Sequence, residues 1–254
     1  MIANVVALSL TGIICVLVPL VVLGIIMKKN SLEKGGVFLA FLSGAIVYLI
    51  MEWGIKEHGL QMLFKKKAFV TFVNEHYILY LLAVAFAGAL LAVLAECFIA
   101  IIAFKRQMSF GKIMMFGLGY AMLEAVMLVG YRSILTLVEL AKGTEAEIST
   151  TTTELFLAGY ERILMMIIHI AITVVLVYFI EQKKSVLGVG IAVFCQMMAA
   201  FLPGFFIAFS TERFYEMYTR EWALLLVYIV LTMSAICGIV VLNSLKYYCT
   251  EKKS

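Results

Sequence analysis

Five ionisable residues stand inside apolar stretches of the chain. Glu161, Arg162 and His169 share one such stretch, and Glu96 and Glu124 lie in two others. An isolated charge in the bilayer core costs on the order of 2.5–3.5 kcal/mol, so these groups should face a protein interior and have partners. Carboxylates and an imidazole are groups of general acid–base chemistry, whereas a satisfied ion pair would only hold helices together. We expect Arg162 to pair with Glu124, with Glu161 available beside it.

The composition places these groups in a membrane protein. Hydrophobic residues make up 64% of the 254 residues and charged residues only 14%, with a mean hydropathy of +1.07. A soluble domain cannot cover its surface with so little charge. The net charge of +4 does not indicate a nucleic-acid partner. All sixteen acidic residues are Glu, which excludes an intramembrane protease that uses two aspartates.

Seven apolar stretches are long enough to cross a bilayer, which takes about 20 residues per helix. They lie near 2–27, 36–54, 77–104, 110–131, 155–180, 186–209 and 222–245. The first lacks the basic start and the small-residue exit of a cleaved signal, so we expect it to stay as an anchor. The sequence predicts an all-α, polytopic helical membrane protein, with residues 1–254 forming a single transmembrane domain.

The basic residues predict an orientation in the cell membrane. Loops 28–35, 105–112 and 181–185 together with the C-terminal tail carry 11 Lys and Arg, against 8 in the loops on the other side. Because basic residues favour the cytoplasmic side, we expect the N-terminus outside and the C-terminus in the cytoplasm. The segment Gly54–Asn74 mixes apolar and basic residues, as an interfacial helix does. The segment 139–154 is expected to be a polar outer loop.

Helical rise predicts that four polar side chains share one depth. Counted from the inner ends of their spans, Glu96, Tyr120, His169 and Gln196 lie about 12–17 Å deep, at about 1.5 Å per residue. Four helices contributing at one level could line a central cavity. Each residue alone also fits a simpler role, as interhelical hydrogen bonding or packing. Only one of three histidines is within a span, and no H-E-x-x-H occurs, so neither a metal nor a cofactor is expected.

Several of these stretches resemble one protein family. Segments Ala95–Phe104, Phe116–Ala125, Gly159–Arg162 and His169–Ala171 are similar, in order and spacing, to the YhfC-like intramembrane proteases. These are glutamic-type membrane proteases related to the CAAX-processing enzymes. The resemblance covers about residues 77–205. It implies that Glu96 stands where the family has the first of two glutamates that activate water, and that Glu124, Glu161 and Arg162 are retained family positions.

Other positions of the family pattern are replaced. Cys97 and Ala100 stand where the resemblance implies a second glutamate and an arginine, and Tyr120 stands for a histidine. Gln196 and Ala200 stand for a histidine and an Asp or Asn. Loss of a general base typically costs 10²–10⁴ in rate, and loss of an oxyanion-stabilising group about 10²–10³. The pattern therefore predicts a chain without measurable peptidase activity.

The sequence favours a non-catalytic role, in which the inherited cavity binds a membrane peptide, a lipid or a partner protein. The candidate remnants of the site are Glu96, Tyr120, Glu124, His169 and Gln196. One alternative is a working protease that uses Glu96, Glu124 and His169 in an altered arrangement. Another is a transporter, or a transporter subunit, in which Glu124 and the Glu161–Arg162 pair line a path. The absence of inverted repeats disfavours the transporter.

Overall fold

The computed structural model describes residues 2–29, 33–102, 109–142, 151–211 and 217–251, and within these ranges it contains helices and no strand. The elements in chain order are α1 (Ile2–Lys29), α2 (Lys34–Tyr48), η2 (Leu49–Glu57), α3 (His58–Phe64), α4 (Lys67–Glu75), α5 (Tyr77–Ile102), α6 (Phe110–Ala125), η3 (Val126–Gly130), α7 (Tyr131–Ala141), α8 (Thr152–Glu181), α9 (Ser185–Ala208) and α10 (Arg220–Glu251). The segments η2 and η3 are π-helical.

Seven helical segments are long and apolar enough to cross a membrane, as the sequence predicts, and the all-α fold is confirmed. They are Ala3–Lys29, Lys34–Phe64, Tyr77–Ile102, Phe110–Ala141, Thr152–Glu181, Ser185–Ala208 and Arg220–Lys246. This arrangement fits a multi-pass membrane protein. The expected loops 28–35, 105–112, 139–154 and 210–221 fall partly outside the described residues.

Two spans are longer than the sequence analysis predicts. The second continues to Phe64 instead of ending near 54, and the fourth continues to Ala141 instead of ending near 131. Both predicted ends precede a basic residue, where the apolar pattern stops. In the second span, Lys56 forms an ion pair with Glu52 four residues earlier, so the charges accompany the helix instead of ending it. Gly54–Asn74 was expected to be an interfacial helix. Its first part, up to Phe64, belongs to the second span, and the rest lies mostly in the separate helix α4.

The fifth span begins earlier than the predicted residue 155. Thr151 caps α8: its hydroxyl accepts a hydrogen bond from the backbone N–H of Glu154, and the Glu154 side chain accepts one from the Thr151 backbone. This reciprocal pair satisfies two N–H groups that a helix start would otherwise leave without partners. Residues 151–154 therefore belong to the helix start, not to the expected outer loop.

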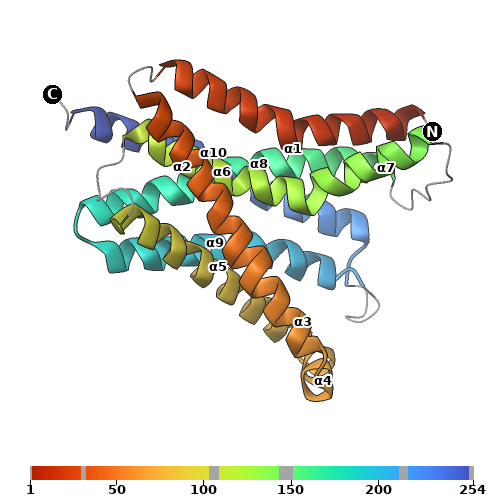
Figure 1. The fold of residues 1–254 in the computed structure, drawn as a ribbon. Coiled ribbons are helices and arrows are strands. Elements are labelled where there is room, and N and C mark those ends of the chain that lie inside the picture. The colour runs from red at the N-terminus through yellow and green to blue at the C-terminus, as the bar shows by residue number, and fades with distance from the viewer. Residues whose placement is uncertain (1, 30–32, 103–108, 143–150, 212–216, 252–254) are drawn as a thin grey trace.

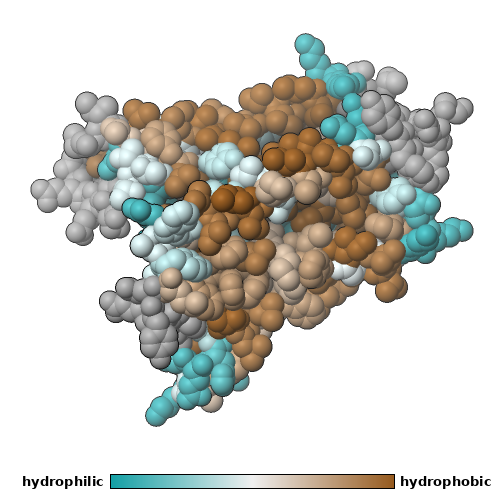
Figure 2. Space-filling view, turned by 180° about the vertical axis from the view of Figure 1, so that it is seen from behind, coloured by the Kyte–Doolittle hydropathy of each residue, from teal (hydrophilic) through white to brown (hydrophobic). Residues whose placement is uncertain are grey.

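The helix α8 lies at the centre of the bundle. It contacts α1, α6, α9 and α10, and it is the most buried of the seven spans. Figure 1 shows α1 beginning at the end of the bundle where α7 ends, and α10 ending at the opposite end. Figure 2 shows apolar residues over the middle of one face and polar residues toward its edges, the distribution expected of a surface in contact with lipid.

The helices α2 and α6 cross through two reciprocal glycine contacts. A Cβ atom on Gly44 would lie 1.9 Å from the carbonyl oxygen of Phe116, and one on Gly119 would lie 1.9 Å from that of Phe41. Each glycine therefore directs a Cα hydrogen at a carbonyl of the other helix, which is a contact that holds closely packed membrane helices together. The crossing brings the rings of Tyr48 and Tyr120 into contact.

Candidate functional site

Arg162 of α8 lies between two carboxylates. Its Nη1 atom is 3.2 Å from Oε1 of Glu124 on α6, and its Nη2 atom donates to Oε1 of the neighbouring Glu161. The Arg162 side chain is buried, as the sequence analysis expects for a residue on the interior face of this helix. The pairing with Glu124 joins two spans through charge-assisted hydrogen bonding.

His169 contacts the second oxygen of the same carboxylate. Its Nε2 atom lies 2.6 Å from Oε2 of Glu124, at ion-pair distance. The contact is an ion pair when the imidazole is protonated. Glu124 thus has Arg162 on one oxygen and His169 on the other. Both of these residues lie on α8, seven positions apart on one face.

Glu96 of α5 is buried and has a different partner. The Thr173 hydroxyl donates to Oε2 of Glu96 over 3.0 Å. Thr173 follows His169 by four residues and therefore lies one turn further along the same face of α8. It also packs against Gly117 of α6, where a Cβ atom would lie 2.9 Å from the Thr173 hydroxyl oxygen. A glycine at that position gives α8 the room to approach.

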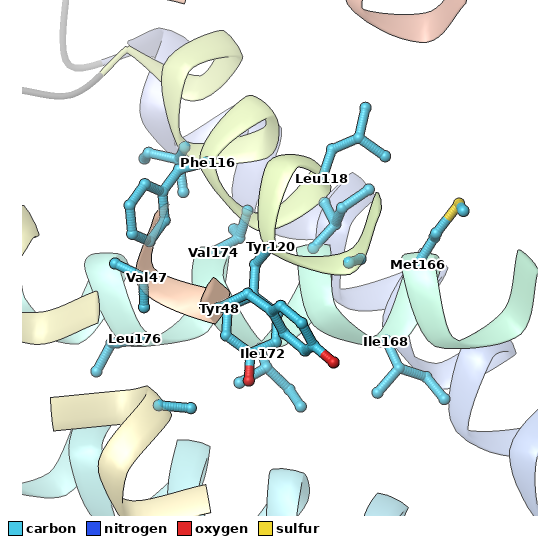
Figure 3. Close-up of a cluster of buried hydrophobic side chains, with 14 of the residues drawn as sticks. Val47, Tyr48, Phe116, Leu118, Tyr120, Met166, Ile168, Ile172, Val174 and Leu176 are labelled. Atoms are coloured by element: carbon cyan, nitrogen blue, oxygen red, sulfur yellow. The ribbon is translucent and has the colours of Figure 1, made fainter. Parts of the chain in front are cut away.

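Two tyrosines connect the α2–α6 crossing to this centre. The ring of Tyr120 is 4.9 Å from that of His169, and the ring of Tyr48 meets Tyr120 edge-on at 5.3 Å and 87°. Figure 3 shows the two tyrosine rings together beside α8, near Ile168 and Ile172. Such edge-to-face packing contributes about 0.5–1.5 kcal/mol beyond burial alone. An aromatic wall therefore separates the polar groups from the apolar core around them.

A further ion pair was not singled out by the sequence analysis. Glu52 and Lys56 lie in η2 and pair with each other. They pack against α5 at Gly88, where a Cβ atom would lie 3.1 Å from Lys56 Cδ and 3.2 Å from Glu52 Oε1. The i, i+4 spacing of Glu before Lys at the end of an apolar run was the available signal. Thr173 and Tyr48 were also missed, and neither type stands out in an apolar helix.

The structure brings together most of the candidate residues. Glu96, Tyr120, Glu124 and His169 are joined through the contacts above, whereas Gln196 of α9 is half-buried and shares none of their hydrogen bonds within the described ranges. Among the residues that the structure describes, no three His, Cys, Asp or Glu side chains are placed to hold a metal ion.

Both oxygens of Glu124 and one oxygen of Glu96 contact groups of the protein itself. A carboxylate that activates water needs an oxygen free to accept the water's proton. Glu124 has cationic or imidazole nitrogens at both oxygens, and Glu96 accepts from a hydroxyl. Arg162 Nε is buried and has no hydrogen-bond partner among the described residues. The arrangement is that of an interhelical polar network with one donor left over.

Comparison of the chain with known protein families, with curated proteins and with solved structures finds no match in any of the three.

Proposed function

We propose that this chain is a non-catalytic integral membrane protein with the layout of a YhfC-like intramembrane protease, and that it binds a membrane peptide, a lipid or a partner protein. The proposal includes its orientation in the cell membrane, with the N-terminus outside and the C-terminus in the cytoplasm. The family motifs support the layout, and the replaced positions support the loss of hydrolysis.

The main support for a non-catalytic role is that both carboxylate oxygens of Glu124 already have partners within the protein. Its two carboxylate oxygens face Arg162 at 3.2 Å and His169 at 2.6 Å. A base in this position would have to give up a cationic partner inside the bilayer before it could take a proton from water, which is costly. The network is therefore better suited to holding α6 against α8 than to hydrolysis.

The surroundings of Glu96 support the same conclusion. Ala100, which stands where the family resemblance implies an arginine, is buried in the apolar core four residues after Glu96. Tyr120, in place of a histidine, is also buried and packs on Tyr48. A phenol has a reference pKa of about 10, so near neutral pH it stays a neutral hydrogen-bond donor. Ala100 therefore offers an oxyanion no donor, and Tyr120 offers only a neutral one in place of a protonable imidazole.

The test has two parts, run on the full chain. First, the purified protein in proteoliposomes is incubated with membrane-spanning peptides, and cleavage products are sought by mass spectrometry. We expect none. Cleavage that disappears in Glu96→Gln would contradict the proposal and support a working protease with an altered site.

Second, the protein is cross-linked and affinity-purified from native membranes. The proposal expects a stoichiometric membrane peptide, lipid or protein to come along in wild type. The control is Gly44→Ala, which we expect to disturb the bundle without touching any ionisable group. Recovery of the chain alone, with no enriched partner or lipid, would overturn the binding role.

A further inference from the structure

The buried polar groups form a line, and we infer that this line is a hydrated blind path through which Glu96 exchanges protons with only one side of the membrane. The polar line is defined by Glu161, Arg162, Glu124, His169, Thr173 and Glu96. Its open end is the end of the bundle where α8 begins. This inference does not depend on the proposed function, because a protein with or without a partner could have such a path.

The line consists of two contacting parts on one face of α8, Glu161 to His169 and Thr173 to Glu96, separated by one helical turn. Arg162 contacts Glu161 and Glu124, and His169 reaches the other oxygen of Glu124 at 2.6 Å. Thr173 lies one turn beyond His169 and donates to Glu96. From 161 to 173, the polar side chains cover about 18 Å of α8 at about 1.5 Å per residue. That is more than half of a hydrocarbon core of about 30 Å.

Exposure falls from one end of the line to the other. The side chain of Glu161 is 29% exposed, that of Glu124 14% and that of Arg162 7%. The side chain of His169 is 2% exposed, and Glu96 is 4% exposed. Exposure is thus greatest at Glu161, which lies nearest to the start of α8, and is nearly lost from His169 onward, since Thr173 is only 1% exposed.

Water is needed to complete the hydrogen bonding along the line. Arg162 Nε is buried without a hydrogen-bond partner among the described residues. Buried donors that the protein leaves unsatisfied are commonly satisfied by internal water, provided that the site is polar. This donor lies between the exposed and the buried end of the line. Water bound there would add a polar group between Glu161 and His169.

Beyond Glu96, the path is closed by apolar side chains. The next buried residues on the Thr173 face of α8 are Leu176 and Ile180. On α5, Ala100 follows Glu96 by one turn, and on α6, Ile113 precedes Gly117 by one turn. All four belong to one hydrophobic cluster. Within the described ranges, a proton that reaches Glu96 from the α8 start therefore meets a layer of buried apolar side chains toward the other end.

The charges along the line cancel when His169 and Glu96 each hold a proton. Arg162 faces two carboxylates, so a protonated His169 makes the set neutral while Glu96 holds its own proton. Neutral sets are the less costly ones inside a bilayer.

Among the other titratable groups on the elements packed around α5, Tyr120 of α6 interacts with Glu96, and the Glu52–Lys56 ion pair of η2 packs against α5 at Gly88, eight residues before Glu96. On α9, Cys195 is the only titratable residue and is exposed, while Cys97 neighbours Glu96 on α5 itself.

Carbodiimide labelling tests the sidedness. Dicyclohexylcarbodiimide enters membranes and reacts with protonated carboxyl groups, so mass spectrometry of the peptide that contains Glu96 measures how often this carboxyl holds a proton. Right-side-out and inside-out vesicles that contain the full chain are labelled at external pH values from about 5.5 to about 8.5, with the membrane potential clamped. An epitope at the N-terminus identifies which side faces the medium, since Asn4 and Thr152 are hydrogen-bonded at one end of the bundle.

We expect Glu96 labelling to fall by up to about tenfold per pH unit when the medium faces the start of α8, and to stay constant when it faces the other end. In His169→Gln, the response should weaken or vanish, while Glu96→Gln should remove the label. Equal responses in both vesicle types would overturn the inference, and so would the absence of a response or of any label on Glu96. If His169→Gln does not fold, the comparison of wild-type Glu96 labelling between the two vesicle types is sufficient to test the inference.

Discussion

Gly44 of α2 lies so close to Phe116 of α6 that a Cβ atom would stand 1.9 Å from the Phe116 carbonyl oxygen. No side chain can shift to relieve such a contact, because the obstacle is backbone. The same distance separates Gly119 from the Phe41 carbonyl. The two helices can therefore approach to this distance only while both positions are glycine.

We expect Gly44→Ala to lower the stability of the folded bundle strongly. Overpacking commonly costs about 1–3 kcal/mol, and a rigid backbone neighbour places this case at or beyond the upper end. Thermal unfolding of the detergent-purified protein measures the loss. Gly35→Ala in the same helix is the matched control, because nothing lies within 4 Å of a Cβ there. Equal melting temperatures for the two variants would show that the crossing is looser than described.

Arg162→Met should reduce the folded yield far more than Arg220→Met. Removing one member of a buried ion pair commonly costs about 3–5 kcal/mol, because the other charge stays buried without its partner. Arg220 also pairs with a glutamate, Glu154, at 2.9 Å, but its side chain is exposed, and exposed pairs contribute about 0–1 kcal/mol. Fluorescence-detected gel filtration of the two variants provides the comparison.

The double variant Arg162→Met with Glu124→Gln tests the pairing itself. If the cost of Arg162→Met arises from stranded carboxylate charge, then neutralising Glu124 should recover part of the yield. His169 keeps a polar partner in this variant, since glutamine still offers an oxygen. A double variant that is as poor as the sum of both single variants would show that the two residues act independently.

Thr173→Val should destabilise the protein while Thr173→Ser should not. Valine has nearly the shape of threonine but removes the hydroxyl that donates to Glu96, and a buried acceptor without its donor costs about 1–3 kcal/mol. Serine keeps the donor and loses one methyl group. Unfolding in denaturing detergent gives the difference. Similar losses in both variants would assign the role of Thr173 to packing against Gly117.

A variant that retains only Cys249 should react with a membrane-permeant thiol reagent in intact cells, and not with an impermeant one. The expectation follows from the proposed orientation, with the C-terminal tail in the cytoplasm, which the 11 to 8 distribution of basic residues favours. The other four cysteines are replaced by alanine in this variant. Strong labelling by the impermeant reagent would reverse the proposed orientation.

The sequence predicted the helices well where the apolar pattern was uninterrupted, and less well where charges entered it. The number of spans followed from length and hydropathy alone. The ends of the second and fourth spans did not. In the second span, Lys56 is neutralised by Glu52 within the same helix, and a window of hydropathy counts the charges without pairing them. The fourth span continues past Arg132, whose side chain is exposed. The start of α8 could have been placed from the capping pattern of Thr151 and Glu154.

The polar centre was predictable in part for a similar reason. An unpaired charge in the bilayer core is costly in free energy, so an ionisable residue in an apolar helix should face a partner. The pairing of Glu124 with Arg162 could be predicted on this ground. The Thr173 hydroxyl costs little in an apolar helix, so nothing in the sequence marks it as the partner of Glu96. Equal depth also does not imply contact: Gln196 was expected at the level of the other polar groups, but within the described ranges it shares none of their hydrogen bonds.

The contact between Glu124 and Arg162 also has a consequence during biosynthesis. The two residues are 38 positions apart and belong to the fourth and fifth spans, which leave the ribosome one after the other. The fifth span carries its charge into the insertion machinery while the fourth, with the neutralising carboxylate, has only just entered. The two can thus pass into lipid as one hairpin, so that the arginine need never meet the acyl chains alone.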